Sequence, residues 1–246
     1  MQIDLNSDLG EGYPLDRDLM PLISSANIAC GAHAGDAATM QQTIALCLEH
    51  GVAIGAHPSW PDRCGFGRHP MLLPTEEVYA LIRDQLQSLA DLAPGGKLHH
   101  VKPHGALYNQ SAADPELATI IARAVYDTDP GLLLLGLSGS LSCSKARELG
   151  LQTAAEVFAD RRYEDDGSLV PRSQPDALIK NPQEAAAQAL RLAQEGTVIT
   201  RSGKQIRLQA DTICIHGDEP NALALAQAIR FTLQQHGIAI QALSHH

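Results

Sequence analysis

Aromatic residues, basic clusters and long apolar runs are all scarce in this 246-residue sequence. Aromatic residues make up 4% of the chain, so alanine and leucine are expected to pack most of the core. The formal net charge is −10 and no basic stretch stands out, which argues against nucleic acid and anionic membrane surfaces as partners. No apolar run approaches the roughly 20 residues that cross a bilayer, and no signal peptide is expected, because no basic segment precedes an apolar one at the N-terminus.

Several familiar signatures are absent as well. The five cysteines are odd in number and include no Cys-x-x-Cys, so neither a disulfide framework nor a zinc knuckle is indicated. Cysteines without a pairing pattern fit the reducing cytoplasm, which is the predicted location. The sequence lacks Gly-x-Gly-x-x-Gly, Gly-x-Ser-x-Gly and the phosphate-binding loop Gly-x-x-x-x-Gly-Lys-[Ser/Thr], so it has no recognisable nucleotide cradle or nucleophile elbow.

The sequence does contain a repeated alternation of short apolar runs with amphipathic helical patterns. The runs that predict strands lie near residues 3–5, 25–30, 52–56, 99–102, 132–137, 153–158 and 213–215. About seven parallel strands alternating with helices predict an α/β fold, a closed or nearly closed (β/α) barrel forming a single domain over residues 1–246. A β-hairpin insertion is predicted near 198–208. The alternative is an open doubly wound sheet, but the sequence lacks the Gly-x-Gly-x-x-Gly motif typical of that fold.

Most predicted strands end in ionisable residues beside glycine or proline. Residues 25–36 show the pattern best: a small, apolar strand runs into a glycine-flanked turn with His33 and Asp36, and a helix follows. The carboxyl ends of barrel strands share one rim, where such barrels place their sites. We therefore expect one pocket to collect side chains from distant segments, namely Asp8, His33, His57, Lys102, His104 and His216.

Two kinds of chemistry remain open at this rim. Asp8 or Glu11 could act as a general base or metal ligand, or could simply build a turn with Asn6. Asp8, His33 and His57 could together hold Zn²⁺ or a similar divalent metal with an open position for water. However, no His-Glu-x-x-His spacing supports a metal, and a single histidine is more often a hydrogen-bonded structural residue.

Lys102 is the most unusual residue of the set. A lysine at the end of a buried strand is costly unless its charge is paired. It could neutralise a substrate carboxylate or stabilise a developing oxyanion. The structural alternative is an ion pair with a buried carboxylate, for which the candidates are Asp8, Glu11 and Glu156.

The same choice between structure and function applies to the other charged residues. Asp160 and Arg161 follow a predicted strand and could pair with one another or face a ligand. Arg68 and Arg172 lie in predicted loops and could clamp a carboxylate or phosphate with two hydrogen bonds. Most loop arginines, by contrast, are simply solvated.

Longer motifs at these positions resemble the LamB/YcsF family. The matching segments are 4–11 (DLNSDLGE), 26–36 (ANIACGAHAGD), 55–58 (GAHP), 61–62 (PD), 65–68 (GFGR), 101–109 (VKPHGALYN), 158–163 (FADRRY) and 216–218 (HGD). They occur in order, and the resemblance runs from residue 3 to about 237, so it covers nearly the whole chain. It implies a (β/α) barrel related to the polysaccharide-deacetylase barrels.

The resemblance also implies an activity, that of the A subunit of a bacterial 5-oxoprolinase. Such a protein cleaves 5-oxo-L-proline to L-glutamate with ATP hydrolysis, in the cytoplasm and together with partner subunits B and C. The partners would bind ATP and activate the lactam by phosphorylation, which agrees with the missing phosphate-binding loop. Ring opening then requires a water, a base, a stabiliser of the developing negative charge and a clamp for the substrate carboxylate.

These needs give each candidate residue a role. The catalytic candidates are Asp8, Glu11, Lys102, His104 and Asp160. The substrate-binding candidates are Asn6, Asn27, His33, His57, Arg68, Tyr108, Arg161 and His216. Asp8 or His104 would be the base, Lys102 the electrostatic stabiliser, and Arg68 or Arg161 the clamp.

Two alternatives belong to other functional classes. One is a stand-alone, metal-dependent amide hydrolase or deacetylase that uses Asp8, His33 and His57; metal analysis and activity after chelation would distinguish it. The other is a non-catalytic scaffold or substrate carrier for the other subunits. Binding of 5-oxoproline with dispensable acid–base residues would favour the carrier.

Overall fold

The computed structural model describes residues 1–217 and 221–244. Three sequence-based assignments lie outside these residues: Asp218 of the 216–218 motif, a start of the last helix at Pro220, and the terminal His245-His246 pair. The main strands are β1 (Gln2–Leu9), β2 (Ser25–Ala29), β3 (Ala53–His57), β4 (His100–Val101), β5 (Leu133–Leu137), β6 (Gln152–Phe158) and β9 (Thr212–Cys214). Over the described residues these seven strands are parallel and close into a barrel in the order just given, because β9 pairs with both β6 and β1. The predicted seven-stranded barrel is thus confirmed.

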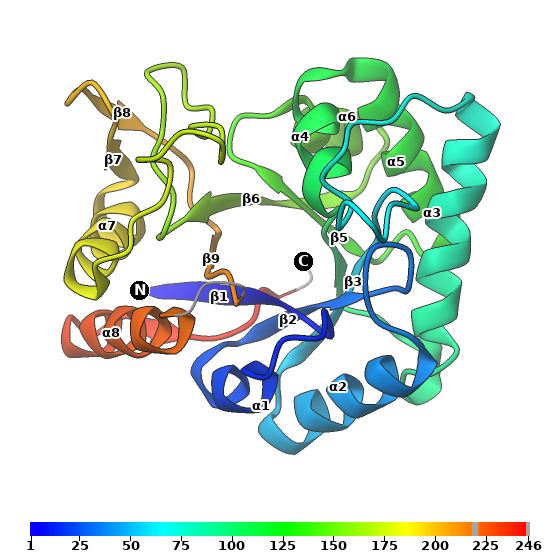
Figure 1. Ribbon diagram of the computed structural model, residues 1–246, viewed down its shortest axis with the longest axis horizontal. Helices are drawn as coiled ribbons and strands as arrows, with labels where there is room; N and C mark the ends of the chain where they lie inside the picture. The colour runs from blue at the N-terminus through cyan, green and yellow to red at the C-terminus, as the bar shows by residue number, and fades with distance from the viewer. Residues whose placement is uncertain (218–220, 245–246) are drawn as a thin grey trace.

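Helices surround the barrel (Figure 1). They are α1 (Asp16–Leu19), α2 (Ala37–His50), α3 (Thr75–Ala90), α4 (Gly105–Ala113), α5 (Pro115–Thr128), α6 (Leu141–Glu148), α7 (Pro182–Glu195) and α8 (Ala222–Gln235), with 3-10 turns at Met20–Leu22 and Pro94–Gly96. Local chemistry sets several ends: Asp36 caps α2 by accepting from the Thr39 amide, and Gly51 ends it in the left-handed conformation. In the described part of the chain, none of the helices combines the length and apolarity needed to cross a membrane.

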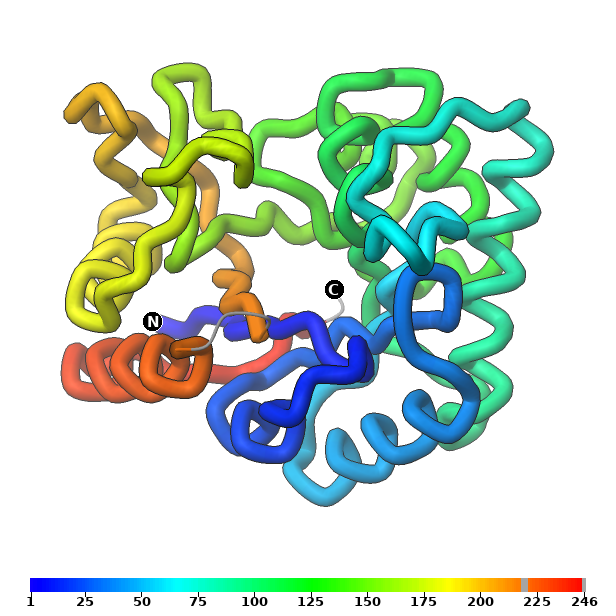
Figure 2. The backbone as a smooth tube through the Cα atoms, viewed as in Figure 1, coloured from blue at the N-terminus to red at the C-terminus, as the bar shows by residue number. Residues whose placement is uncertain are grey.

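Three short strands lie outside the closed ring. β10 (Ala239–Ile240) pairs in parallel with the first residues of β1. β7 (Thr197–Ile199) and β8 (Gln205–Arg207) form an antiparallel hairpin, as predicted near 198–208. The segment 159–181 runs beside this hairpin, as the yellow-green and orange chains of Figure 2 show. The two are joined where the Arg201 amide donates to the Tyr163 carbonyl oxygen at 2.8 Å.

The interior of the barrel is polar along β1. The buried Asp4 carboxylate accepts hydrogen bonds from Ser24 and Ser25 at 2.7 Å, and burial raises its pKa. Two residues further along the strand, the Asn6 amide donates to the Thr212 hydroxyl at 2.7 Å. Because every second residue of β1 points inward, this row continues to Asp8. The row forms the floor beneath the carboxyl rim.

Gly55 on β3 makes room for this interior. A Cβ atom there would lie 2.0 Å from His100 Nε2, and the His100 ring in turn lies 2.8 Å from Asn27 Oδ1. Gly55→Ala is expected to lower the free energy of unfolding by about 1–3 kcal/mol, because overpacking displaces a buried ring. Urea denaturation measures this. Gly131→Ala is the matched control, since its Cβ would meet only the exposed Asp129 side chain; equal losses in both variants would contradict the packing argument.

Candidate active site

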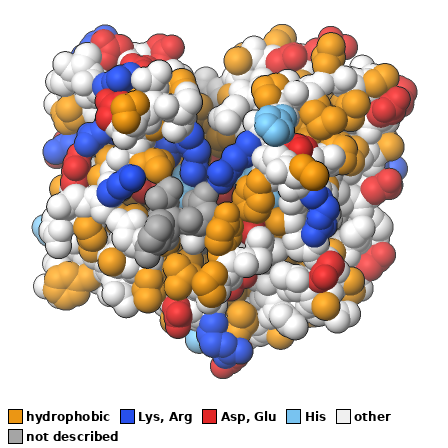
Figure 3. Space-filling model, viewed as in Figure 1, with side chains coloured by type: hydrophobic (Ala, Val, Ile, Leu, Met, Phe, Trp, Pro, Cys, Tyr) orange, Lys and Arg blue, Asp and Glu red, His pale blue; other side chains and the backbone are white. Residues whose placement is uncertain are grey.

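The carboxyl ends of the strands meet at one rim, and most of the predicted site residues line one pocket there. Those that line it are Asp8, Glu11, His57, Arg68, Lys102, His104, Tyr108, Arg161 and His216, joined by Phe158 and Arg172. A narrow inner chamber of about 70 Å³ is continuous with an outer groove of about 600 Å³, with Arg68, Arg161 and Arg172 common to both. Figure 3 shows basic side chains gathered along the central hollow of this face. A groove of that size falls within the range of small-molecule sites.

Lys102 forms the base of the chamber. Its ammonium lies 2.9 Å from both Asp8 Oδ1 and Glu156 Oε1, and 3.1 Å from Cys214 Sγ. Of the three carboxylates proposed from sequence as its partners, it therefore pairs with Asp8 and Glu156. Burial would lower the pKa of Lys102, but the neighbouring negative charges raise it well above its usual value. The lysine is thus a permanently charged group, 3% exposed, at the bottom of the pocket.

Asp8 and two asparagines form one unit with this ammonium. The Asn27 amide donates to Asn6 Oδ1 and to Asp8 Oδ1 at 2.8 Å each. Burial would raise the pKa of Asp8, but the charges of His57 and Lys102 hold it well below its usual value. Asn6 and Asn27, predicted to bind substrate, are fully buried beneath the pocket, where Asn27 contacts Asp8.

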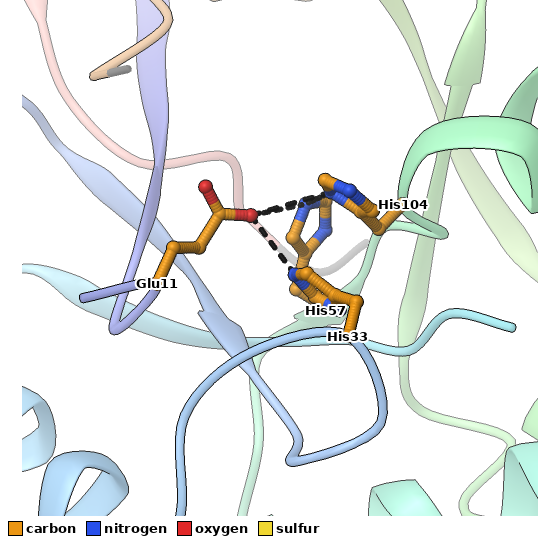
Figure 4. A group of neighbouring side chains, drawn as sticks. All are labelled: Glu11, His33, His57 and His104. Atoms are coloured by element: carbon orange, nitrogen blue, oxygen red, sulfur yellow. Dashed lines mark hydrogen bonds and ion pairs between the residues drawn. The ribbon is translucent and has the colours of Figure 1, made fainter. Parts of the chain in front are cut away.

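Glu11 and three histidines form a compact cluster (Figure 4). Asp8 adjoins it, with Oδ2 3.3 Å from His57 Nε2. Glu11 Oε1 lies 2.9 Å from His33 Nε2, 3.3 Å from His104 Nδ1 and 3.8 Å from His57 Nε2. The His33 and His104 rings stack with centroids 3.8 Å apart. Burial lowers the pKa of His33 to about 3 and also lowers that of His104. His33 and His104 are therefore neutral near pH 7.

The loop after β3 shapes this cluster. Phe66 has a positive φ of 55°, which is rare for a residue other than glycine. Gly67 follows, and a Cβ there would lie 2.9 Å from His104 Cδ2 and 3.0 Å from His33 Cβ. The sequence motif contained both residues but gave no sign that the backbone, rather than the side chains, was needed.

On the opposite side of the pocket, Asp160 pairs with His216 rather than with Arg161. Asp160 Oδ2 accepts from His216 Nδ1 at 2.8 Å. Burial would raise the pKa of Asp160, but His216 holds it below its usual value. Arg161 donates from Nη2 to the Val170 carbonyl oxygen at 2.7 Å. Asp160, predicted to be catalytic, is 2% exposed and lies behind His216.

Arg161 Nε, in the pocket wall, has no hydrogen-bond partner among the described residues. The Tyr108 hydroxyl is directed at Glu156, and burial together with that carboxylate raises the pKa of Tyr108 well above its usual value. Since buried polar groups are nearly always hydrogen-bonded, Arg161 Nε is suited to a ligand.

Glu156 lies beneath the pocket, and the sequence analysis considered it only as an ion-pair partner. It is fully buried in β6 against Lys102. Its signal was a lone carboxylate inside the apolar run of 153–158. An isolated buried charge requires an opposite charge, and Lys102 was the available lysine.

A closed parallel barrel whose strand ends carry buried carboxylates and histidines belongs to the same fold class as the polysaccharide-deacetylase barrels. A family 4 carbohydrate esterase from Streptomyces lividans superposes with a TM-score of 0.55 at 14% identity, covering 99% of this chain and 93% of the esterase, which shows the fold alone. Within that class, the chain belongs to the LamB/YcsF family, whose sequence model matches residues 3–246.

Two other proteins are much more similar to this chain than the esterase is. The A subunit of the 5-oxoprolinase of Shouchella clausii strain KSM-K16 is 53% identical over 247 residues, which span 98% of each chain. The crystal structure of the lactam utilization protein from Thermus thermophilus superposes with a TM-score of 0.93 at 45% identity, covering 99% of this chain and 100% of that one.

Proposed function

We propose that this chain is the component of an ATP-dependent 5-oxoprolinase that opens the lactam ring of 5-oxo-L-proline to give L-glutamate. Its relatives are named as a 5-oxoprolinase component and a lactam utilization protein, which supports a role in lactam processing. The observation that carries the proposal is the charge of the pocket. In a chain of net charge −10, one small chamber gathers Lys102, Arg68, Arg161 and Arg172.

This distribution of charge suits a substrate with two anionic groups. 5-Oxoproline carries a carboxylate, and phosphorylation of its lactam oxygen adds a second anion on the same small ring. Guanidinium groups match carboxylate and phosphate geometry with paired hydrogen bonds. We assign the substrate carboxylate to Arg161 and Arg172, and the lactam oxygen to the side of Lys102.

The chemistry divides into two hydrolytic steps after phosphoryl transfer. Water adds to the lactam carbon, the ring C–N bond breaks, and the water proton passes to the ring nitrogen, which leaves glutamyl phosphate. A second water then releases inorganic phosphate and glutamate. Lys102 stabilises the negative charge of the phosphorylated tetrahedral intermediate, and Asp8, beside it in the pocket, orients the attacking water.

ATP and the first step belong to partner subunits in this proposal. The sequence contains no phosphate-binding loop, and the Shouchella clausii relative is named as one lettered component, which implies further subunits. We identify these as 5-oxoprolinase subunits B and C. The five unpaired cysteines support a cytoplasmic location for the assembly.

The test is an assay of glutamate release from 5-oxo-L-proline. The complete mixture contains the purified chain, subunits B and C, and ATP. Further mixtures each omit one of these components. Release is expected only with the full set, with one ADP formed for each glutamate. Release by B and C without this chain would overturn the proposal, and release by this chain alone without ATP would replace it with the stand-alone hydrolase.

A further inference from the structure

The outward-facing ring nitrogens of two cluster histidines are fixed as donors. His57 Nδ1 lies 2.7 Å from the Lys102 carbonyl oxygen, and His104 Nε2 lies 2.9 Å from the Phe66 carbonyl oxygen. A carbonyl oxygen can only accept a hydrogen bond, so each of these nitrogens carries the proton of its imidazole. In the neutral ring, the other nitrogen then presents a lone pair.

His33 has the same arrangement through a hydroxyl. His33 Nδ1 lies 2.8 Å from Ser59 Oγ, which in turn lies 2.9 Å from the Trp60 carbonyl oxygen. When the Ser59 hydroxyl donates to that carbonyl oxygen, Ser59 Oγ accepts from His33 Nδ1 and the lone pair falls on His33 Nε2. In that tautomer all three imidazoles direct a lone pair inward.

The inward atoms converge with the carboxylate of Glu11. One donor atom from each of the four residues lies within 4.8 Å of all the others. His57 Nε2 and His104 Nδ1 are 2.9 Å apart, as are His33 Nε2 and Glu11 Oε1. Two lone pairs at that distance repel unless a proton or another cation lies between them.

A single cation between the four inward atoms would contact all of them at once. It would also remove the repulsion between the lone pairs of His57 Nε2 and His104 Nδ1.

We propose that Glu11, His33, His57 and His104 bind one divalent transition-metal ion. Zinc bonds of about 2.0–2.1 Å in a tetrahedron place neighbouring ligand atoms about 3.3 Å apart. Four of the six separations within the cluster are 2.9, 2.9, 3.3 and 3.8 Å, which bracket that value, and all six are within 4.8 Å. Imidazole ligands favour zinc, cobalt, nickel or iron over magnesium and calcium, which prefer oxygen ligands alone.

Hydrogen bonds from the surrounding residues hold the three imidazoles in place. Each imidazole donates its other ring nitrogen to a carbonyl or hydroxyl oxygen, the arrangement that fixes the tautomer and orientation of metal-bound histidines. The positive φ of Phe66 is a local strain that turns its carbonyl oxygen toward His104. Such strain persists only where the surrounding structure holds it.

This ligand set differs from the Asp8, His33 and His57 trio expected from the sequence. Asp8 Oδ2 lies 3.3 Å from His57 Nε2, but the carboxylate that lies within reach of all three histidines is that of Glu11. Asp8 Oδ1 accepts from Lys102 and Asn27. A second grouping, of Asp8 with Cys214 and His216, holds no metal in this proposal. The Lys102 ammonium already lies 2.9 Å from Asp8 Oδ1 and 3.1 Å from Cys214 Sγ.

The metal would face the inner chamber, because Glu11, His57 and His104 line it. A bound divalent ion supplies a Lewis acid that polarises a carbonyl or phosphoryl oxygen. Metal binding itself does not rest on the proposed lactam chemistry. It can therefore be measured without substrate or partner subunits.

The experiment is metal titration of the full chain after removal of metals with a chelator. Zn²⁺ is followed by calorimetry and elemental analysis, and Co²⁺ by its visible absorption. We expect one equivalent per chain, with Co²⁺ bands of a four-coordinate site. Glu11→Gln and His33→Asn should each weaken affinity by more than about 100-fold, beyond the 10–100-fold typical of losing an outer hydrogen-bond partner.

His216→Asn is the matched control, since it removes a pocket histidine outside the cluster and should leave affinity within a few-fold of the original. Circular dichroism confirms that each variant is folded, and the near-isosteric Glu11→Gln carries the test should His33→Asn unfold. Wild-type protein that binds neither ion would overturn the proposal. The proposal would also be overturned if Glu11→Gln bound metal as tightly as the wild type. A loss of metal affinity in His216→Asn with affinity retained in Glu11→Gln would overturn it as well.

Discussion

Lys102→Met is expected to lower ATP-dependent glutamate release by at least about 100-fold and to destabilise the fold at the same time. The rate falls because a preorganised charge that faces the developing negative charge typically contributes about 10²–10³ in turnover. The stability falls because the ammonium lies 2.9 Å from both Asp8 and Glu156, with Glu156 fully buried. Removing one partner of such a buried pair costs about 3–5 kcal/mol.

A second substitution separates the two effects. Lys102→Met with Glu156→Gln removes the buried positive charge together with one of its negative partners. The double variant should recover much of the free energy of unfolding, measured in urea, but not the rate of glutamate release with subunits B and C. A double variant that regains both would reduce Lys102 to a structural ion pair, and near-normal release by Lys102→Met alone would rule out its catalytic role.

Arg161→Gln is expected to raise the KM for 5-oxo-L-proline by about 10–100-fold, with a smaller change in kcat. A hydrogen bond to a charged group contributes about 1.5–3 kcal/mol, and each 1.4 kcal/mol is tenfold in affinity. Arg161 is 7% exposed, and its Nε has no hydrogen-bond partner in the described part of the chain. A substrate carboxylate would supply that partner.

The control for this variant is Arg123→Gln on the surface of α5. Arg123 Nε lies 3.5 Å from Asp127 on an exposed helix face, so its loss removes the same charge far from the pocket. Steady-state kinetics over a range of 5-oxoproline concentrations measures both variants. Equal KM values in Arg161→Gln and the wild type would contradict the assignment of the carboxylate.

The convergence of the site could be predicted from the sequence because it follows from topology. Asp8, His57 and Lys102 lie far apart in the chain, but each comes at or just after the carboxyl end of an apolar run. Parallel strands of one barrel bring such ends to one rim, whatever the distance in sequence. The same alternation predicted the number of strands and the hairpin near 198–208.

The pairing of side chains within the rim could not be predicted. Asp8 and Glu11 are three residues apart, and the course of the backbone after Leu9 decides that Asp8 meets Lys102 while Glu11 meets His33. Asp160 likewise pairs with His216, which lies 56 residues further along the chain, and not with its neighbour Arg161. Such choices depend on ångström-scale geometry that periodicity does not encode.

The role of backbone groups in the site could not be predicted from the sequence either. The Phe66 carbonyl oxygen orients His104, and its position depends on a positive φ that any sequence pattern would disfavour at phenylalanine. Helix α4 begins at Gly105, inside the 101–109 motif, so among the residues after His104 it is the helical turn that brings Tyr108 and Asn109 to the pocket.

A crystal structure of the chain with 5-oxo-L-proline, grown with the ligand at saturating concentration, tests the central claim most directly. We predict the lactam in the inner chamber, with its carboxylate at Arg161 and Arg172 and its carbonyl oxygen on the side of Lys102. A lactam bound elsewhere on the molecule, or bound in the chamber with its carboxylate turned away from the arginines, would contradict the account.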